Sequence, residues 1–195
     1  MLKQATILLL SALPLAACNK GPDINVKNAS VGEVAEQVRA AAGDGSLISP
    51  GRWETKVTLL DVDAPGLPPQ YAEQLKQSIG KAQGGTVTAC MTEADVKKPR
   101  EDFFAARSKD CRYDHFTMSG GKIDAQFTCT PGHGGTMHMK MSGTYSSDAY
   151  DATMAMTSSG GGGMGGITMK SHTESHRVGE CRGDEDNVKS RAVGK

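Results

Sequence analysis

The sequence predicts a mainly β protein of the α+β class: a curved antiparallel meander sheet of six to seven strands, with one or two short helices and two disulfides. After Pro50, apolar and polar residues alternate with a period of two, which is typical of strands that bury one face. Two other segments repeat their apolar residues at helical spacing. The 195 residues include only four Phe, four Tyr and one Trp, but five cysteines. We therefore expect disulfides to support a thin core.

The first residues have the features of a secretory signal. A basic start at Lys3 is followed by an apolar run that ends at Ala17 and is shorter than the about 20 residues of a membrane span. Leu15-Ala16-Ala17-Cys18 resembles the bacterial lipobox, in which the cysteine receives a thioether-linked diacylglycerol and becomes the acylated first residue after cleavage. We therefore expect residues 1–17 to be a lipoprotein signal peptide and Cys18 to carry acyl chains such as palmitate.

The expected location is the cell envelope, on the periplasmic side of a membrane. Two or three acyl chains at Cys18 give stable anchoring, whereas one chain gives only marginal binding. Asp after the lipidated cysteine commonly retains lipoproteins in the inner membrane, so Asn19 favours the outer membrane. The alternative is an ordinary signal peptide in which Cys18 occurs by chance.

The charge balance argues against a nucleic-acid partner. The whole chain has 22 basic and 22 acidic side chains. Cleavage before Cys18 removes 17 of the 195 residues with Lys3 as their only charged side chain, which leaves 21 basic against 22 acidic residues and a net charge of −1. A near-neutral chain has no basic surface of the kind that binds phosphate backbones.

Residues 18–49 are expected to be a lipidated tether with one short amphipathic helix. Residues 19–29 are polar and contain Gly21 and Pro22. Ser30-Val31-Gly32-Glu33 has the spacing of a capping box, and the apolar residues that follow recur at helical intervals up to Gly43.

Residues 50–181 are expected to form the disulfide-stapled domain. Its first half is predicted to contain strands at 53–59 and 86–91, a helix at 69–82 after a proline-rich break, and helical turns at 92–95 and 99–106. Its second half is predicted to be a meander that ends with a strand at 167–178, after a glycine loop at 160–166. Residues 182–195 are charged and are expected to be a flexible tail.

The first predicted hairpin joins residues 111–118 to 122–129 through Ser119-Gly120-Gly121. A three-residue loop pairs residues whose numbers sum to 240. The expected pairs are Tyr113 with Phe127, His115 with Ala125, and Cys111 with Cys129. Opposed residues of an antiparallel pair are close enough to form a disulfide. Four cysteines allow three pairings, and this register selects Cys111–Cys129, which leaves Cys90–Cys181.

The second predicted hairpin joins residues 136–146 to 149–158 and turns at Ser147-Asp148. Its opposed residues sum to 295. The expected pairs are Tyr145 with Tyr150, Met141 with Met154, and Met139 with Met156. The apolar side chains of both strands then fall on one face, which independently supports this register.

Several short motifs together resemble a known family. They are Pro50-Gly51-Arg52-Trp53-Glu54, Cys90-Met91-Thr92, the two cysteines that flank a glycine turn, Ser142-Gly143-Thr144-Tyr145 and Gly179-Glu180-Cys181. In this order they are similar to the proteobacterial domain-of-unknown-function family 3617, over about residues 50 to 181. The resemblance implies secretion and often lipidation. It brings no activity, ligand or catalytic residue.

A cluster of methionines and one histidine is the candidate metal site. Its members are Met137, His138, Met139, Met141, Met154 and Met156. Thioether sulfurs are soft ligands that suit Cu(I). The other explanation is that methionines on one face of a hairpin fill the core, because their flexible side chains pack against irregular neighbours. We favour the core role, and alternation then directs His138 away from the methionines.

The remaining histidines give a weaker indication of metal binding. His172 and His176 are four residues apart, which would bring them together on a helix but places them about 13 Å apart on a strand. We therefore expect no shared zinc site. His133 lies in a glycine-rich turn and is expected to be exposed.

No motif indicates an enzyme. The chain has no Gly-x-Ser-x-Gly, no Cys-x-x-Cys and no phosphate-binding loop. The glycines at 160–163 lack the lysine and helix that such a loop needs, and the carboxylates at Glu93, Asp95, Glu101 and Asp102 suit helix starts and surface positions.

We therefore expect a non-catalytic envelope lipoprotein, without a cofactor, that binds a hydrophobic molecule or a partner protein. The observation behind this hypothesis is the one-sided apolar stripe of the meander. One alternative is a periplasmic copper-binding or metal-stress protein that uses Met and His side chains. Another is a structural or assembly component of the envelope.

Overall fold

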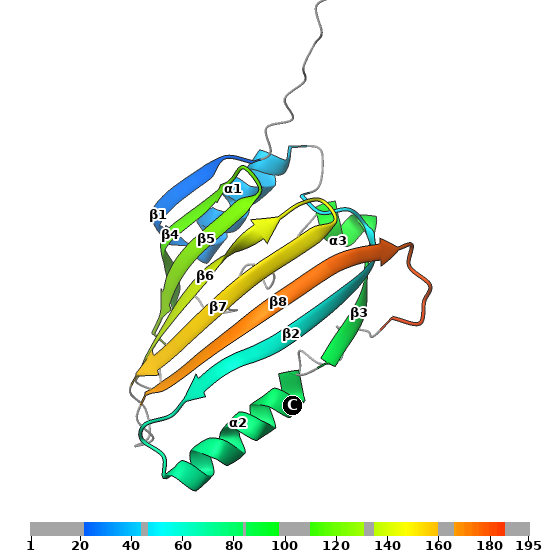
Figure 1. Cartoon of the computed structure of the whole chain (residues 1–195). Coiled ribbons are helices and arrows are strands. Elements are labelled where there is room, and N and C mark those ends of the chain that lie inside the picture. The colour runs from blue at the N-terminus through cyan, green and yellow to red at the C-terminus, as the bar shows by residue number, and fades with distance from the viewer. Residues whose placement is uncertain are drawn as a thin grey trace, which may run out of the picture.

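The fold is a single eight-stranded antiparallel sheet with three helices (Figure 1). The computed structural model describes residues 22–43, 47–83, 85–97, 110–130, 135–159 and 166–185. The expected signal peptide, Cys18, the helical turn at 99–106, His133 and most of the glycine loop and tail lie outside these residues. The strand order is β1-β4-β5-β6-β7-β8-β2-β3, so β1 and β3 form the two edges.

The elements follow the expected order, with one additional strand. The strands are β1 (Ile24–Ser30), β2 (Gly51–Asp63), β3 (Gly85–Met91), β4 (Cys111–Ser119), β5 (Lys122–Cys129), β6 (Thr136–Tyr145), β7 (Ala149–Ser159) and β8 (Ile167–Gly179). The helices are α1 (Val31–Ala42), α2 (Pro69–Gln83) and α3 (Glu93–Lys97). The class is mainly β, as predicted.

Strand β1 corrects the prediction of a polar tether at 19–29. It pairs with β4 along almost its whole length, from Ile24 opposite Met118 to Ser30 opposite Arg112. Ile24 and Ala29 are buried, whereas most residues between them are exposed. With so few apolar side chains, this edge strand has a composition that resembles a linker. Because they pair with β4, residues 24–29 belong to the folded domain.

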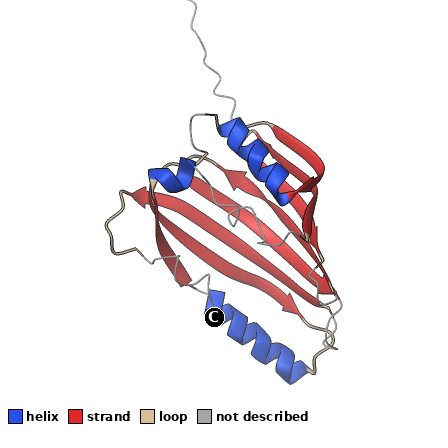
Figure 2. Cartoon of the chain, turned by 180° about the vertical axis from the view of Figure 1, so that it is seen from behind, coloured by secondary structure: helices blue, strands red, loops and turns tan. Residues whose placement is uncertain are grey.

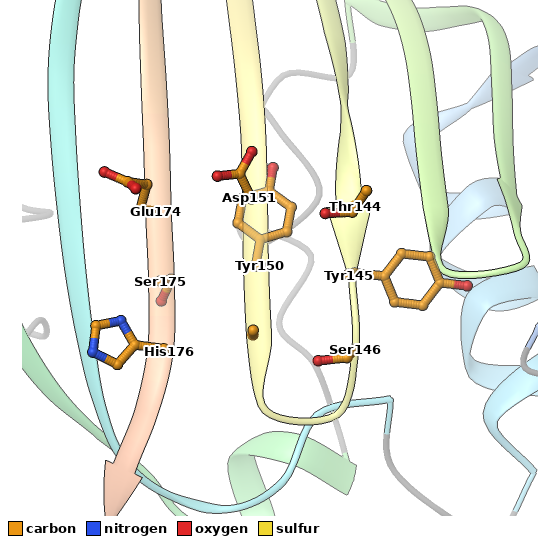
Figure 3. A pocket seen from close by; sticks show the side chains of 9 residues that line it. Thr144, Tyr145, Ser146, Tyr150, Asp151, Glu174, Ser175 and His176 are labelled. Atoms are coloured by element: carbon orange, nitrogen blue, oxygen red, sulfur yellow. The ribbon is translucent and has the colours of Figure 1, made fainter.

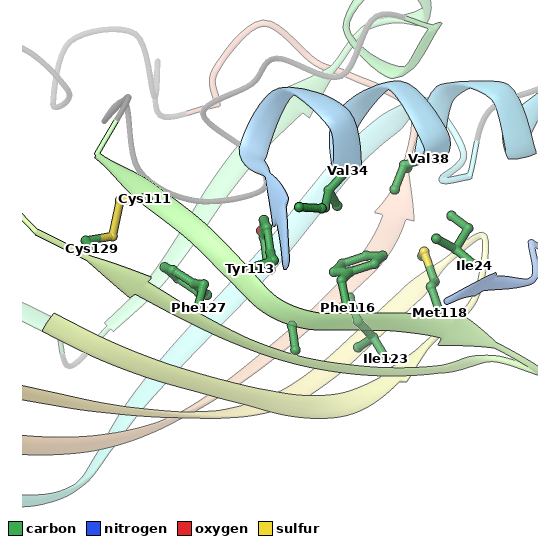
Figure 4. Packing of buried hydrophobic residues seen from close by; sticks show 12 residues of the cluster. Ile24, Val34, Val38, Cys111, Tyr113, Phe116, Met118, Ile123, Phe127 and Cys129 are labelled. Atoms are coloured by element: carbon green, nitrogen blue, oxygen red, sulfur yellow. A yellow bond between two sulfur atoms is a disulfide. The ribbon is translucent and has the colours of Figure 1, made fainter. Parts of the chain in front are cut away.

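Helix α1 covers the sheet at β1 and β4 and forms the main core with them (Figure 4). The predicted capping box is present: Ser30 Oγ accepts from the Glu33 N–H at 3.2 Å, and Glu33 accepts from the Ser30 N–H at 2.6 Å. Val34 and Val38 are fully buried against Tyr113 and Phe116. Burial raises the pKa of Tyr113 to about 12.

The β4–β5 hairpin carries the predicted Cys111–Cys129 disulfide, but its register changes within the strand. Tyr113 lies opposite Phe127, as expected. A bulge then follows, so that His115 faces Gln126 and not Ala125. The strands close at Ser119 opposite Lys122, which shortens the predicted three-residue loop to a Gly-Gly turn in which both glycines have positive φ.

The β6–β7 hairpin has the predicted register throughout. Strand β8 then pairs with β7, β2 pairs with β8, and β3 pairs with β2. The predicted second disulfide, Cys90–Cys181, links the end of β3 to the residues that follow β8. Residues 182–185, expected to begin a flexible tail, contact the sheet instead: Arg52 donates to Asp184 at 2.6 Å.

Helices lie on one face of the sheet, near its two sides. Figure 2 shows α1 over the β1–β4 side and α2 beside the opposite edge. Helix α2 contacts β2, where Gly80 approaches Leu59. We call the face that carries α1 the inner face and the opposite one the outer face.

Candidate functional site

The inner face is mostly apolar across the central strands. Strand pairing places Phe127, Met139, Met156, Met169 and Val62 side by side in one row. The adjacent row runs through Ala125, Met141, Met154, Ser171 and Leu59. Because alternate residues of a strand share a face, both rows lie on the side that carries α1.

The methionines of this face are less buried than the core under α1. Phe116 and Phe127 are almost fully buried, and Met118 is 5 % exposed. The methionines of β6, β7 and β8, by contrast, are all half-buried. Those of β6, at positions 137, 139 and 141, pack against the edge of the core cluster. The apolar surface therefore extends from the core under α1 toward α2, with partial access to solvent.

Met169 belongs to this surface although it was not among the sequence candidates. It lies directly opposite Met156 on β8. The sequence indicates only that Met169 lies in the last alternating strand. The β7–β8 register is needed to show that it shares a face with Met156. That register follows a long glycine loop, so no turn geometry predicts it.

Two tyrosines, Tyr145 and Tyr150, lie opposite each other on the inner face near the β6–β7 turn. Tyr150 donates from Oη to the sulfur of Met141 at 3.1 Å. Burial raises the pKa of Tyr150, and the Asp151 carboxylate adds to this shift. Burial also raises the pKa of Tyr145, and its Oη is buried without a hydrogen-bond partner among the described residues. With raised pKa values both tyrosines are neutral near pH 7, so they add no charge to the inner face.

His138 lies on the outer face, away from the methionines with which it alternates. It is exposed, and its Nδ1 is 3.1 Å from the Thr128 hydroxyl. A site that combines His138 with the methionines of the same hairpin is therefore excluded. The sequence had directed the histidine and the methionines to opposite sides, and that prediction is confirmed.

The outer face is polar and pairs its histidines with carboxylates. His115 Nε2 is 2.5 Å from Asp124, and His172 Nε2 is 3.0 Å from Asp151. His176 Nε2 lies 3.9 Å from Glu54 Oε2. His172 and His176 thus have different carboxylate partners, in agreement with their expected separation on a strand.

A shallow pocket of about 300 Å³ lies near the β6–β7 turn and is lined by residues of both faces of the sheet (Figure 3). Strands β6, β7 and β8 contribute its side chains, including Asp151, Glu174 and His176. Asp151, Glu174 and His172 bring one ligand atom each within 4.8 Å of one another. Asp151 and Glu174 are directly opposed and exposed. Alternation alone did not reveal this cluster, because it too depends on the β7–β8 register.

None of the described helices has the length and apolar character needed to cross a membrane. Residues 48–181, well over half of the chain, match a family model described as a protein of unknown function (DUF3617). No curated protein and no solved structure matches the chain.

Proposed function

The chain belongs to the DUF3617 family, and because that family has no assigned activity we propose a function from the geometry: a non-catalytic envelope lipoprotein that binds an apolar molecule on the inner face of its sheet. The observation that carries this proposal is the row of half-buried methionines between α1 and α2. A soluble domain stabilises itself by covering apolar side chains, so a partly accessible apolar surface indicates a binding site.

The chemistry of the surface suits an acyl chain. Methionine side chains are flexible and polarizable, and they adapt to ligands without a fixed shape. The ring of Tyr150 adds apolar area and holds Met141 in place through its hydroxyl. The neutral tyrosines and the absence of charged side chains from the two described rows favour an uncharged ligand segment.

Binding is tested with the chain from residue 18 onward, which retains every described residue and carries Cys18→Ser so that no lipid is attached. A fluorescent long-chain fatty acid is titrated into this protein and into Met156→Lys. An ammonium group among apolar neighbours is costly, so we expect the affinity to fall at least about tenfold, equivalent to about 1.4 kcal/mol.

Thr157→Lys is the matched control. Thr157 is the next residue of β7, is exposed and points to the outer face. The proposal requires unchanged affinity in this variant and normal thermal unfolding in both. An unmodified chain that does not bind the fatty acid, or a loss of affinity equal in both variants, would contradict it.

The lipid anchor is a separate part of the proposal and has its own test. Cells that produce the full chain are supplied with an alkyne-labelled palmitate, and the protein is isolated from membranes. We expect label on the peptide that begins with Cys18 and a soluble, unlabelled protein after Cys18→Ala. Label elsewhere, or membrane association that persists without Cys18, would refute the anchor.

A further inference from the structure

We propose that Met139, Met156 and Met169 form a Cu(I) site on the inner face, with three thioether sulfurs as ligands. This inference goes beyond the proposed binding of an apolar molecule and uses residues of the same surface. It rests on the register of three strands and on the chemistry of the side chains that this register brings together.

The three methionines are consecutive neighbours across β6, β7 and β8. Met139 lies opposite Met156, and Met156 lies opposite Met169. Neighbouring strands are about 4.8 Å apart, so the two outer positions are about 10 Å apart with Met156 midway between them. Each side chain has three rotatable bonds. The outer two can therefore turn toward the centre and bring all three sulfurs around one ion above Met156.

The partners of the neighbouring residues separate this row from the other methionines. Met141 lies opposite Met154, and Met154 lies opposite Ser171, so that row has only two thioethers. Met137 lies opposite Ser158, and Ser158 lies opposite Ile167, so its row has no second thioether. Among the described strands, the row at 139, 156 and 169 is the one in which methionine occupies three adjacent strands.

Thioether sulfur is a soft, uncharged ligand that selects Cu(I) over the harder divalent cations. The rows around the proposed site contribute apolar and small polar side chains, and the histidine of the same hairpin lies on the opposite face. The site therefore offers sulfur alone, a donor set that also disfavours Zn²⁺, which prefers thiolate, imidazole and carboxylate ligands.

Core packing alone predicts a different degree of burial. Met118, which fills space under α1, is 5 % exposed. Met139, Met156 and Met169 remain half-buried. Access from solvent is a requirement for an exchangeable metal site and has no role in packing.

The test is a competition titration of Cu(I) against a chromophoric Cu(I) chelator, without oxygen, using the chain from residue 18 with Cys18→Ser. Substitution of groups around a metal site, even those that only support its ligands, typically lowers affinity 10- to 100-fold. We therefore expect Met139→Leu, Met156→Leu and Met169→Leu each to lower the Cu(I) affinity by at least about tenfold. Leucine keeps the volume and apolar character, so the fold is retained.

Met91→Leu on β3 and His138→Ala on the outer face are the matched controls, and both should bind Cu(I) as the unmodified chain does. X-ray absorption should show sulfur ligands only. Unchanged affinity in the three row variants, an equal loss in Met91→Leu, or a nitrogen ligand would overturn the proposal. The fatty-acid titration of the unmodified chain is read separately: a chain that binds the fatty acid but not Cu(I) overturns the copper site alone, and a chain that binds Cu(I) but not the fatty acid overturns the proposed function alone.

Discussion

Gly143 allows β6 and β7 to approach closely in the middle of the sheet. A Cβ at this position would lie 2.6 Å from Ala152 Cα and closer still to the Asp151 carbonyl oxygen. Both are backbone atoms, which cannot turn aside as a flexible side chain can. The position is therefore restricted to glycine by its neighbours on the next strand.

We expect Gly143→Ala to lower the free energy of unfolding by about 1–3 kcal/mol, the usual cost of forcing extra volume into a packed site. Chemical denaturation measures this change. Gly85→Ala in β3 is the control, because a Cβ there meets nothing within 4 Å. Equal stability of the two variants would show that the strands are farther apart at Gly143 than the structure places them.

Helix α1 shows how an element of the core depends on one local motif. Ser30 and Glu33 satisfy each other's backbone N–H groups at its first turn. Ser30→Ala should destabilise the protein by about 1 kcal/mol at pH 7, as measured by denaturant unfolding. The hydrogen bond from the Ser30 N–H lowers the Glu33 pKa from its ordinary value of 4.5.

That pKa shift sets the pH at which the Glu33 contact contributes. A lowered pKa in the folded state means that the stabilisation is present above pH 4.5 and is lost as the pH falls through the lowered value. Glu33→Gln should therefore reduce the acid sensitivity of unfolding, whereas Glu36→Gln on the same helix should not. The same pH profile in both variants would contradict this account of the first turn.

Local signals predicted most elements, and they failed where a strand departs from regular pairing. The Ser147-Asp148 turn and the methionine pattern were sufficient to predict the whole β6–β7 register. In β4 the bulge moves Phe116 to the inner face, only three residues after Tyr113. That odd spacing between two large apolar residues was the available sign of a bulge. Strand β1 was missed because an edge strand buries too few side chains to show clear alternation.

The arrangement of the whole sheet depends on contacts that sequence periodicity does not specify. Strand β2 pairs with β8 more than a hundred residues later, and a glycine loop separates β7 from β8. Alternation shows that each strand has an apolar side, but it does not show which strands lie next to each other in the sheet. Consequently the methionines of one hairpin could be predicted to share a face, while Met169 and the Asp151–Glu174 pair could not be placed.

One disulfide is local, with a sequence separation of 18 residues between its cysteines, and the other spans 91 residues of sequence. Cys111–Cys129 closes the hairpin beneath α1, and Cys90–Cys181 holds β3 to the end of β8. These links stabilise a sheet whose middle strands carry partly accessible methionines rather than a second buried core. The central claim is therefore that this middle surface is where a ligand binds.

Methyl NMR of the chain from residue 18, labelled with ¹³C in its methionine methyl groups, tests that claim directly. During titration with a long-chain fatty acid, the signals of Met139, Met154, Met156 and Met169 should shift together as the inner face is occupied. Met118 under α1 and Met91 on β3 should remain unchanged. Unaltered signals from Met139, Met154, Met156 and Met169, with shifts confined to Met91 or Met118, would contradict the account.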